Sequence, residues 1–203
     1  MIDRAQVIGA GRVGSAMAAR LRERGLDLSA DDPQLVLLCV PDRTIAEVAA
    51  ALDPHERRFG LHPLQTFTRG RGAEQLDGAF AAVTAETAEA REIGEWLART
   101  LGLEPFSLAD GKRAAYHAGA AIASNYLVTL RRAAGSLLEA AGAPPEALDP
   151  LMRRTIENGF ELTGPISRGD WETVDAHLAA IRAERPELEP MYVALAETTK
   201  ALL

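Results

Sequence analysis

The sequence is poor in cysteine, lysine and aromatic residues. Among its 203 residues Cys39 is the single cysteine, so the chain cannot form an internal disulfide. Lysine occurs at Lys112 and Lys200 only, and 22 basic residues against 29 acidic ones give a formal net charge of −7. A chain with this charge and no basic block interleaved with aromatics is not expected to bind nucleic acid.

Long apolar runs are also missing. The longest fall well short of the roughly 20 residues that span a bilayer, and the N-terminus does not resemble a secretory signal. We therefore expect a soluble, cytoplasmic protein without a membrane partner. The four histidines do not share ligand spacing with cysteines or paired carboxylates, so no metal site is predicted.

The strongest motif is a glycine loop near the N-terminus. An apolar run from residue 5 ends in G-x-G-x-x-G at residues 9–14 and passes into residues with helical spacing, which is the order strand, tight turn, helix. Gly9 would allow the turn, Gly11 would keep a side chain out of the path of a pyrophosphate, and Gly14 would allow close helix–strand packing. Because backbone N–H groups at a helix N-terminus bind phosphates, the motif predicts dinucleotide binding. A structural glycine turn is the alternative.

The part of this unit that would bind the ribose is less well defined. Residues 26–33 alone separate the first helix from the next apolar run, so the second strand is expected to be vestigial or absent. Asp27, Asp31 and Asp32 are candidate ribose ligands, although Asp31 and Asp32 also fit a turn before a proline. Arg12 is either a contact for a 2′-phosphate or a solvated arginine. The cofactor is expected to be NADP, with NAD left open.

Further apolar runs predict a mostly parallel sheet. Strands are expected at residues 35–40, 58–61, 79–83 and 103–108, with helices at 44–52 and 87–101. Cys39 lies in the first of these runs, which favours a buried thiol over a nucleophile. Repeated alternation of strands and helices is typical of an α/β domain.

The ends of these strands indicate where ligands bind. In an open α/β sheet a ligand lies beyond the carboxyl ends of the strands, so His62 and the turn at residues 40–42 should border the cofactor, with Thr66 near the substrate. Asp42 also suits the N-cap of the next helix. The predicted cofactor contacts are Gly9, Gly11, Arg12, Val13, Gly14, Val40, Pro41, Asp42 and His62.

From residue 110 onward the sequence predicts helices only. Asp110 suits the N-cap of a helix over residues 111–141, and further helices are expected at 146–160, 170–183 and from about 187 to the end. The fold class is therefore α/β, with a reduced Rossmann domain at residues 1–109 and an all-helical domain at 110–203. The alanine-rich surface of the first helix predicts a homodimer formed through the helical domain.

One face of that first helix carries candidate catalytic groups. Helical spacing places His117, Ala121, Ser124 and Asn125 on one stripe, which could approach a nicotinamide and its substrate. His117 would then be the proton donor, and Asn125 and Ser124 would orient the substrate. A tight helix–helix seam explains the same spacing.

A polar loop at residues 162–170 is a second candidate contact with the substrate. Thr163 and Arg168 could bind a carboxylate there, because a guanidinium grips a carboxylate with two hydrogen bonds. Asp170 suits the N-cap of the following helix. A structural turn with a helix cap is the alternative interpretation.

Several motifs resemble those of one bacterial family. They lie at residues 40–42, 61–67, 116–118, 123–127 and 162–170. The chain is similar to a family that pairs an NADP-oxidoreductase-like Rossmann domain with a helical domain of unknown function. This family lies within the 6-phosphogluconate dehydrogenase-like superfamily, whose members include ketopantoate and pyrroline-5-carboxylate reductases. The resemblance implies an NAD(P)-dependent oxidoreductase that reduces a small keto or imino acid, with ketopantoate-like acids favoured.

The chain departs from the superfamily pattern at three points. Ala121 stands where the dehydrogenases often carry a lysine one turn before the helix asparagine, and Lys112 lies two turns further back. The second strand is shortened, and a strand end that the family usually carries is missing between Leu52 and Arg58. These departures keep open a non-catalytic protein that binds or senses a dinucleotide.

Overall fold

The computed structural model describes residues 2–29, 31–52 and 57–203. They form two compact units, Met1–Ala120 and Ala121–Leu203, which we call the sheet unit and the helical unit. The sequence placed its domain boundary earlier, after residue 109, and that boundary and the roles given to the two domains stay predictions. The sequence also predicts that a strand end usual in the family is missing between Leu52 and Arg58. Most of that stretch, residues 53–56, lies outside the described part of the chain.

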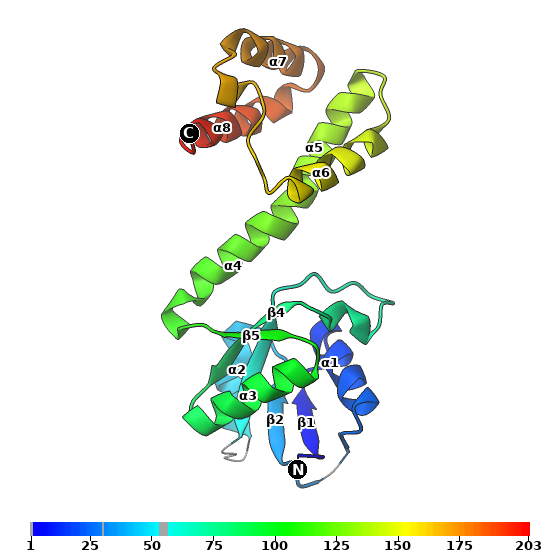
Figure 1. Ribbon diagram of the computed structural model, residues 1–203, viewed down its shortest axis with the longest axis vertical. Helices are drawn as coiled ribbons and strands as arrows, with labels where there is room; N and C mark the ends of the chain where they lie inside the picture. Colours follow the sequence, from blue (N-terminus) through cyan, green and yellow to red (C-terminus); the bar gives the residue numbers. More distant parts are fainter. Residues whose placement is uncertain (1, 30, 53–56) are drawn as a thin grey trace. The chain divides into compact units, whose positions relative to one another are not determined.

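The sheet unit is built on a mostly parallel sheet (Figure 1). The strand order follows the chain: β1 (Ala5–Ile8), β2 (Leu35–Leu38), β3 (Arg58–Pro63), β4 (Phe80–Ala85) and β5 (Glu104–Ser107). All neighbouring pairs are parallel except β3 and β4. The connection between those two strands holds the short 3₁₀ helix η1 (Ala73–Leu76) instead of a full crossover helix, which suits an antiparallel pair. The predicted α/β fold is confirmed.

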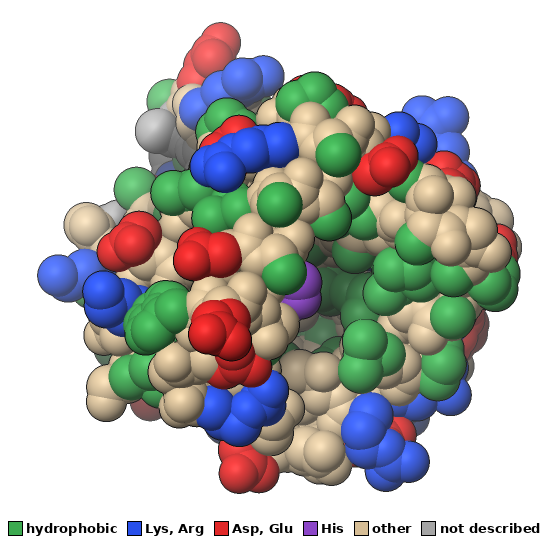
Figure 2. Space-filling view, turned by 90° about the horizontal axis from the view of Figure 1, so that it is seen from above, with side chains coloured by type: hydrophobic (Ala, Val, Ile, Leu, Met, Phe, Trp, Pro, Cys, Tyr) green, Lys and Arg blue, Asp and Glu red, His purple; other side chains and the backbone are tan. Residues whose placement is uncertain are grey.

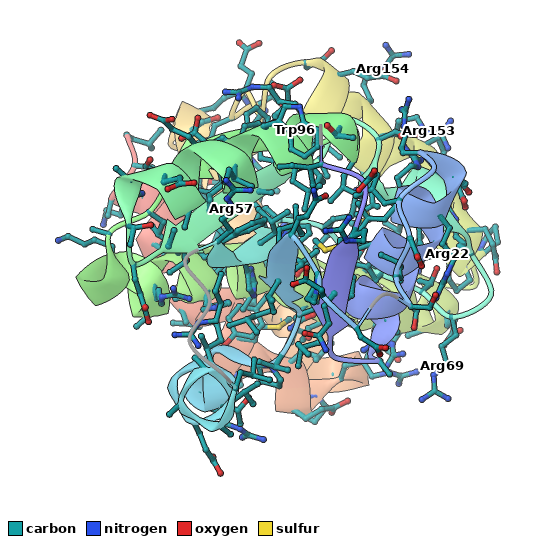
Figure 3. The ribbon with its side chains drawn as sticks, turned by 90° about the horizontal axis from the view of Figure 1, so that it is seen from below. Arg22, Arg57, Arg69, Trp96, Arg153 and Arg154 are labelled. Atoms are coloured by element: carbon teal, nitrogen blue, oxygen red, sulfur yellow. The ribbon has the colours of Figure 1, made fainter. Side chains whose placement is uncertain are left out.

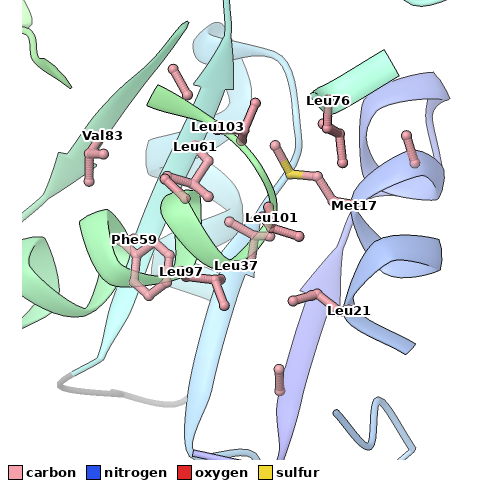
Figure 4. Close-up of a cluster of buried hydrophobic side chains, with 14 of the residues drawn as sticks. Met17, Leu21, Leu37, Phe59, Leu61, Leu76, Val83, Leu97, Leu101 and Leu103 are labelled. Atoms are coloured by element: carbon pink, nitrogen blue, oxygen red, sulfur yellow. The ribbon is translucent and has the colours of Figure 1, made fainter. Parts of the chain in front are cut away.

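Helices cover both faces of this sheet. The main core lies on the face of α1 (Arg12–Glu23) and α3 (Ala88–Thr100), where Met17, Phe59 and Leu97 are almost completely buried (Figure 4). On the other face α2 (Asp42–Ala51) packs against β2 in a smaller cluster. Because side chains alternate along a strand, Arg58, Gly60 and His62 of β3 face the α2 side.

The strand expected between α1 and β2 is reduced to one bridge. Asp27 pairs in parallel with Arg4 beside β1, on the edge away from β2. The N–H of Ala5 donates to the carbonyl of Asp27 at 2.9 Å, and the N–H of Asp27 donates to that of Asp3 at 2.8 Å. The expectation of a vestigial strand is confirmed.

A buried arginine that the sequence did not indicate ties α1 to the rest of the sheet unit. Arg20 is 8% exposed, and its Nη1 lies 2.7 Å from Oδ1 of Asp77. Its guanidinium also donates to the carbonyls of Ala73 at 2.9 Å and Leu101 at 3.2 Å. Arg20 therefore holds η1 and the end of α3 against α1.

The helix after β5 is longer than any other and not uniform. It runs through the 3₁₀ turn η2 (Asp110–Lys112), α4 (Arg113–Ala121), the π-helical turn η3 (Ile122–Tyr126) and α5 (Leu127–Ala140). A π-helix bonds residue i to i+5, so a period of 3.6 residues does not continue through η3. We expected His117, Ala121, Ser124 and Asn125 to share one stripe of an unbroken α-helix. The helix is not an unbroken α-helix, so that expectation is wrong.

The helical unit continues with three more α-helices. These are α6 (Leu148–Glu157), α7 (Trp171–Glu184) and α8 (Glu189–Lys200), with the short 3₁₀ turns η4 (Pro145–Ala147), η5 (Ile166–Arg168) and η6 (Pro186–Leu188) between them. Within the described residues, no helix is long and apolar enough to cross a membrane.

Candidate functional site

The glycine loop has the geometry that its sequence predicts. Gly9 has φ +117°, and a Cβ added to it would lie 2.4 Å from the carbonyl oxygen of Cys39. A Cβ on Gly14 would lie 1.9 Å from the carbonyl oxygen of Gly9, so the helix and the strand end touch at backbone distance. A Cβ on Gly11 would meet no atom within 4 Å. Two of the glycines are therefore required by packing, and the third faces open space.

That open space lies in front of the N-terminus of α1. Gly11 is the N-cap and offers no side chain, and the first turn holds no acidic residue. The first intrahelical bond runs from the N–H of Ser15 to the carbonyl of Gly11, so the N–H groups of Arg12, Val13 and Gly14 precede it. These groups and the helix dipole favour an anion, as a pyrophosphate requires.

Two grooves flank this turn. One, of about 480 Å³, is lined by Gln6, Val7, Ala18, Arg22 and Leu28 with the glycine loop. It lies beside the vestigial strand, where a Rossmann unit holds the adenosine.

The other groove, of about 440 Å³, lies between α1 and residues 68–72, and Arg12, Arg69 and Arg71 line it. Arg22 and Arg69, from the two grooves, lie on the α1 side of the sheet unit in Figure 3. Nη1 of Arg12 donates to the carbonyl of Phe67 at 3.0 Å, so this side chain ties the glycine loop to the segment after β3.

Two of the candidate ribose ligands, Asp27 and Asp32, have other partners. Oδ1 of Asp27 accepts hydrogen bonds from the N–H and Oγ of Ser29 at 2.8 and 2.7 Å, and these bonds lower the pKa of Asp27. Asp32 lies 3.6 Å from Arg4, whose Nε also donates to the Asp32 carbonyl. Both aspartates therefore take part in the local structure of the segment between α1 and β2.

The end of β2 borders the glycine loop. The N–H of Cys39 donates to the carbonyl of Ile8 at 2.7 Å, and its Sγ lies 3.3 Å from Sδ of Met17. Burial raises the pKa of the Cys39 thiol to about 12, which keeps the thiol protonated at neutral pH and disfavours a nucleophilic role. The helix α2 begins at Asp42 with Pro41 as its N-cap, so the expectation that Asp42 is the N-cap is wrong. The side chain of Asp42 lies outside the described atoms.

Three rings meet where β3 ends. The centroids of His62 on β3 and His117 on α4 are 4.6 Å apart with an interplanar angle of 84°. Tyr116 lies 5.7 Å from His62 and 5.4 Å from His117, also edge to face, and its hydroxyl donates to the carbonyl of His62 at 3.3 Å. Two histidines from separate parts of the sequence therefore form one polar cluster on the α2 side of the sheet.

Sequence reasoning named both histidines but missed Tyr116 and the contact between the rings. The alternation of buried Phe59 and Leu61 along β3 was the available signal, since it turns His62 to the opposite face. Thr66 lies further along the same segment, is exposed, and donates its N–H to Oε1 of Gln65 at 2.8 Å.

In the helical unit the loop before α7 is held by its own residues. The guanidinium of Arg168 donates to the carbonyl of Thr163. Asp170 is the N-cap of α7, accepting from the N–H and Oγ1 of Thr173 at 3.2 and 2.7 Å, which lowers its pKa. The predicted cap is confirmed, and this geometry favours the structural interpretation of the loop. Ser124 and Asn125 lie in the π-helical turn.

Within the described part of the chain, no group of three or more histidine, cysteine, aspartate or glutamate residues is placed to hold a metal ion.

Solved structures of several reductases share this fold. A Bacteroides fragilis protein provisionally named an NADP oxidoreductase is 19% identical, with a TM-score of 0.76 and 98% coverage of both chains. A reductive aminase from Aspergillus terreus, in complex with NADPH and ethyl-5-oxohexanoate, is 17% identical with a TM-score of 0.57 over 98% of this chain and 93% of the aminase. A 1-pyrroline-5-carboxylate reductase from Streptococcus pyogenes is 14% identical with a TM-score of 0.56 over 98% and 96%. At these identities the likeness establishes the fold.

Sequence comparison adds the family. No curated protein sequence matches the chain. The sequence model of the domain of unknown function DUF2520 matches residues 79–199, from β4 into α8. Since this match spans more than half of the chain, the protein belongs to the DUF2520 family.

Proposed function

We propose that the protein is an NAD(P)-dependent oxidoreductase that reduces the keto or imino group of a small acid, with NADP as the preferred cofactor. The observation that carries this proposal is the glycine loop, in which Gly9 and Gly14 are fixed by backbone contacts and Gly11 leaves space before the first turn of α1. The fold shared with an NADPH-bound reductive aminase and with a pyrroline-5-carboxylate reductase supports it.

The residues present fit a dinucleotide. The pyrophosphate would lie on the N–H groups at the start of α1, and the adenosine in the groove beside the vestigial strand. Arg22 lines that groove and supplies a positive charge suited to a 2′-phosphate. Arg12 is directed to Phe67 instead, which argues against the role in 2′-phosphate recognition considered from the sequence.

The histidine pair supports a reduction at the end of β3. A bound nicotinamide supplies a hydride to the carbonyl or imine carbon. His117 would give a proton to the oxygen or nitrogen, which yields an alcohol or an amine. His62 and Tyr116 would hold the His117 ring through their edge-to-face contacts.

The remaining site residues stay predictions. Ser124 and Asn125 would orient the substrate. Thr66, Thr163 and Arg168 are candidates for binding its acid group, although the bond from Arg168 to the Thr163 carbonyl favours a structural role for that loop. The superfamily resemblance favours ketopantoate-like acids for this step.

Calorimetry with NADPH and NADH tests the proposal. We expect NADPH to bind the parent protein and Gly11→Asp to abolish binding, because the new carboxylate would accept the helix N–H bonds and repel the pyrophosphate. Aspartate is a favoured N-cap and has open space here, so this variant should fold as well as the parent. Gly111→Asp adds the same charge at an exposed glycine in η2 and is the control. If the parent binds neither cofactor, the proposal is wrong.

The second candidate is a dinucleotide-binding protein without turnover. It is favoured by the reduced second strand and by the bonds that commit the Asp27 carboxylate to Ser29. Both candidates predict that NADPH binds, but the enzyme alone predicts that NADPH is oxidised in the presence of keto or imino acids. A panel of such acids therefore separates them.

We also propose a homodimer formed through the helical unit. Among the described residues, the helical unit buries few large apolar side chains, namely Leu148, Val174 and Ile181. Large apolar side chains are exposed along it, including Val128, Phe160 and Leu195, and apolar side chains reach the surface on the face drawn in Figure 2. An exposed apolar surface of this kind is typical of an interface between subunits.

A further inference from the structure

A pocket of about 310 Å³ lies on the α2 side of the sheet, within the sheet unit. Its apolar wall is formed by Leu38, Ile45 and Ala49, from β2 and α2. Gly60 of β3 also lines it, and a Cβ added there would lie 3.8 Å from the nearest atom, so the absent side chain leaves the pocket open without being required by packing. The pocket is of the size that takes a small organic molecule.

The opposite wall is polar and holds two arginines. Arg58 and Arg113 line it together with Thr84 and Glu86. Arg58 is engaged in the fold, since Nη1 donates to the Ala49 carbonyl at 2.6 Å and Nη2 lies 3.4 Å from Glu86. Arg113 comes from α4, and its Nη2 donates to Oγ1 of Thr84 at 2.7 Å. Thr84 thereby fixes the position of the Arg113 guanidinium in the pocket.

We propose that this pocket binds the carboxylate of an aliphatic acid, with Arg113 and Thr84 as its polar contacts and the β2–α2 wall around its alkyl chain. A guanidinium held in place by a hydroxyl is suited to a planar carboxylate. The apolar wall distinguishes such an acid from a free phosphate ion, which would gain nothing from Leu38 and Ile45.

The position of the pocket connects it to the histidine pair. In the β3–β4 register Gly60 pairs with Thr84, and His62 pairs with Ala82. The Arg113 guanidinium is bonded to Thr84 and so lies at the first of these pairs. His62 belongs to the second, which is the next pair on the same face of the sheet. Two residues along a strand span about 7 Å. Arg113 and His117 are likewise one helical turn, or about 6 Å, apart along α4. An acid held by Arg113 would therefore extend toward His62 and His117.

The distance between Arg113 and the two histidines limits which acids can react. This conclusion about the substrate rests on the proposed function. In a 2-keto acid the reacting carbon is bonded directly to the carboxylate carbon, so it would stay beside Arg113. An acid whose carbonyl or imine carbon lies several bonds from the carboxylate reaches the histidines. The geometry favours such acids over the ketopantoate-like ones.

Calorimetry without any cofactor tests the pocket itself. We expect pentanoate to bind the parent protein more tightly than acetate. Arg113→Gln should weaken pentanoate at least tenfold, and Gly60→Val, which places methyl groups in the pocket and suits a strand, should do the same. Arg99→Gln, at an exposed arginine of α3 outside the pocket, should bind as the parent does. Thermal melts of the variants check that they remain folded.

Three results would overturn the carboxylate assignment. They are no pentanoate binding to the folded parent, equal binding by Arg113→Gln, and inorganic phosphate binding as tightly as pentanoate with the same dependence on Arg113. The isomers 2-oxopentanoate and 4-oxopentanoate then test the substrate step, and we expect NADPH to be oxidised faster with the second. If pentanoate binds but no keto or imino acid is reduced, the pocket stands and the proposed function fails. If reduction does not depend on Arg113, the proposed function stands and the inferred substrate class fails.

Discussion

His62 and His117 contact each other edge to face, with ring centroids 4.6 Å apart, although 55 positions separate them in the chain. If His117 is the proton donor, His117→Phe should lower turnover by about 10²–10⁴-fold, the usual contribution of a general acid. The phenyl ring keeps the edge-to-face packing, so NADPH affinity should be unchanged. Steady-state kinetics with a reducible acid and calorimetry with NADPH measure the two effects. Turnover equal to that of the parent would remove His117 from the mechanism.

The glycine loop predicts different effects on stability for substitutions at Gly14 and at Gly11. Gly14→Ala places a Cβ 1.9 Å from the Gly9 carbonyl oxygen, and we expect it to lower the free energy of unfolding by about 2–4 kcal/mol. Gly11→Ser adds a favourable N-cap residue in open space, so its stability should stay within about 0.5 kcal/mol of the parent. Urea unfolding compares them. A Gly14→Ala variant as stable as the parent would contradict the packing described for the loop.

The buried Arg20 predicts a loss of stability that depends on pH. Arg20→Met leaves the carbonyls of Ala73 and Leu101 without this donor, and we expect it to cost about 2–4 kcal/mol at neutral pH.

The hydrogen bond from Arg20 lowers the pKa of Asp77 below its ordinary 3.8. A carboxyl with a lowered folded-state pKa contributes stability above its unfolded pKa and loses it as the pH falls through the folded pKa. The difference between parent and Arg20→Met should therefore shrink in acid, below pH about 4. Denaturant unfolding at pH 7 and pH 3 measures it, and Arg99→Gln is the control. A difference that does not change with pH would contradict the role of the Arg20–Asp77 pair.

The high pKa of Cys39 predicts an unreactive thiol. At pH 8.5 an ordinary cysteine is about half ionised, whereas a thiol with a pKa of about 12 is ionised to about one part in 3,000. Alkylation of the folded protein by iodoacetamide should accordingly be about a thousandfold slower than that of the unfolded chain. Mass spectrometry of samples with and without denaturant measures the rates, and rapid alkylation of the folded protein would contradict the burial of Sγ.

The sequence determined the fold more fully than the site. Periodicity located each strand, and the short stretch before Leu35 was enough to predict a vestigial second strand, because both signals are local. Contact between His62 and His117 depends on how α4 packs on the sheet, which no local pattern specifies. The π-helical turn at Ile122–Tyr126 was missed because its residues have the composition of an ordinary α-helix. Arg20 reads as a surface residue of α1 until Asp77 and the carbonyls around it are known.

The exposed apolar residues of the helical unit give the last prediction, which concerns the oligomeric state. Val128 on α5 is 52% exposed and Trp96 on α3 of the sheet unit is 41% exposed, so the two units offer a matched pair of apolar surface residues. If the helical unit forms the dimer, Val128→Glu buries a charge in the interface and should shift the protein toward monomers, because an unpaired buried charge costs several kcal/mol. Trp96→Glu should leave the dimer intact.

Sedimentation equilibrium at micromolar concentration distinguishes a chain of 21.7 kDa from its dimer. A parent protein that stays monomeric would contradict the dimer. A dimer broken by Trp96→Glu and not by Val128→Glu would instead place the interface on the sheet unit, because the substitution that adds a charge then disrupts contacts of α3. Both variants exchange an exposed apolar side chain for glutamate. An effect of the added charge that is common to both would therefore not be mistaken for an interface on one unit.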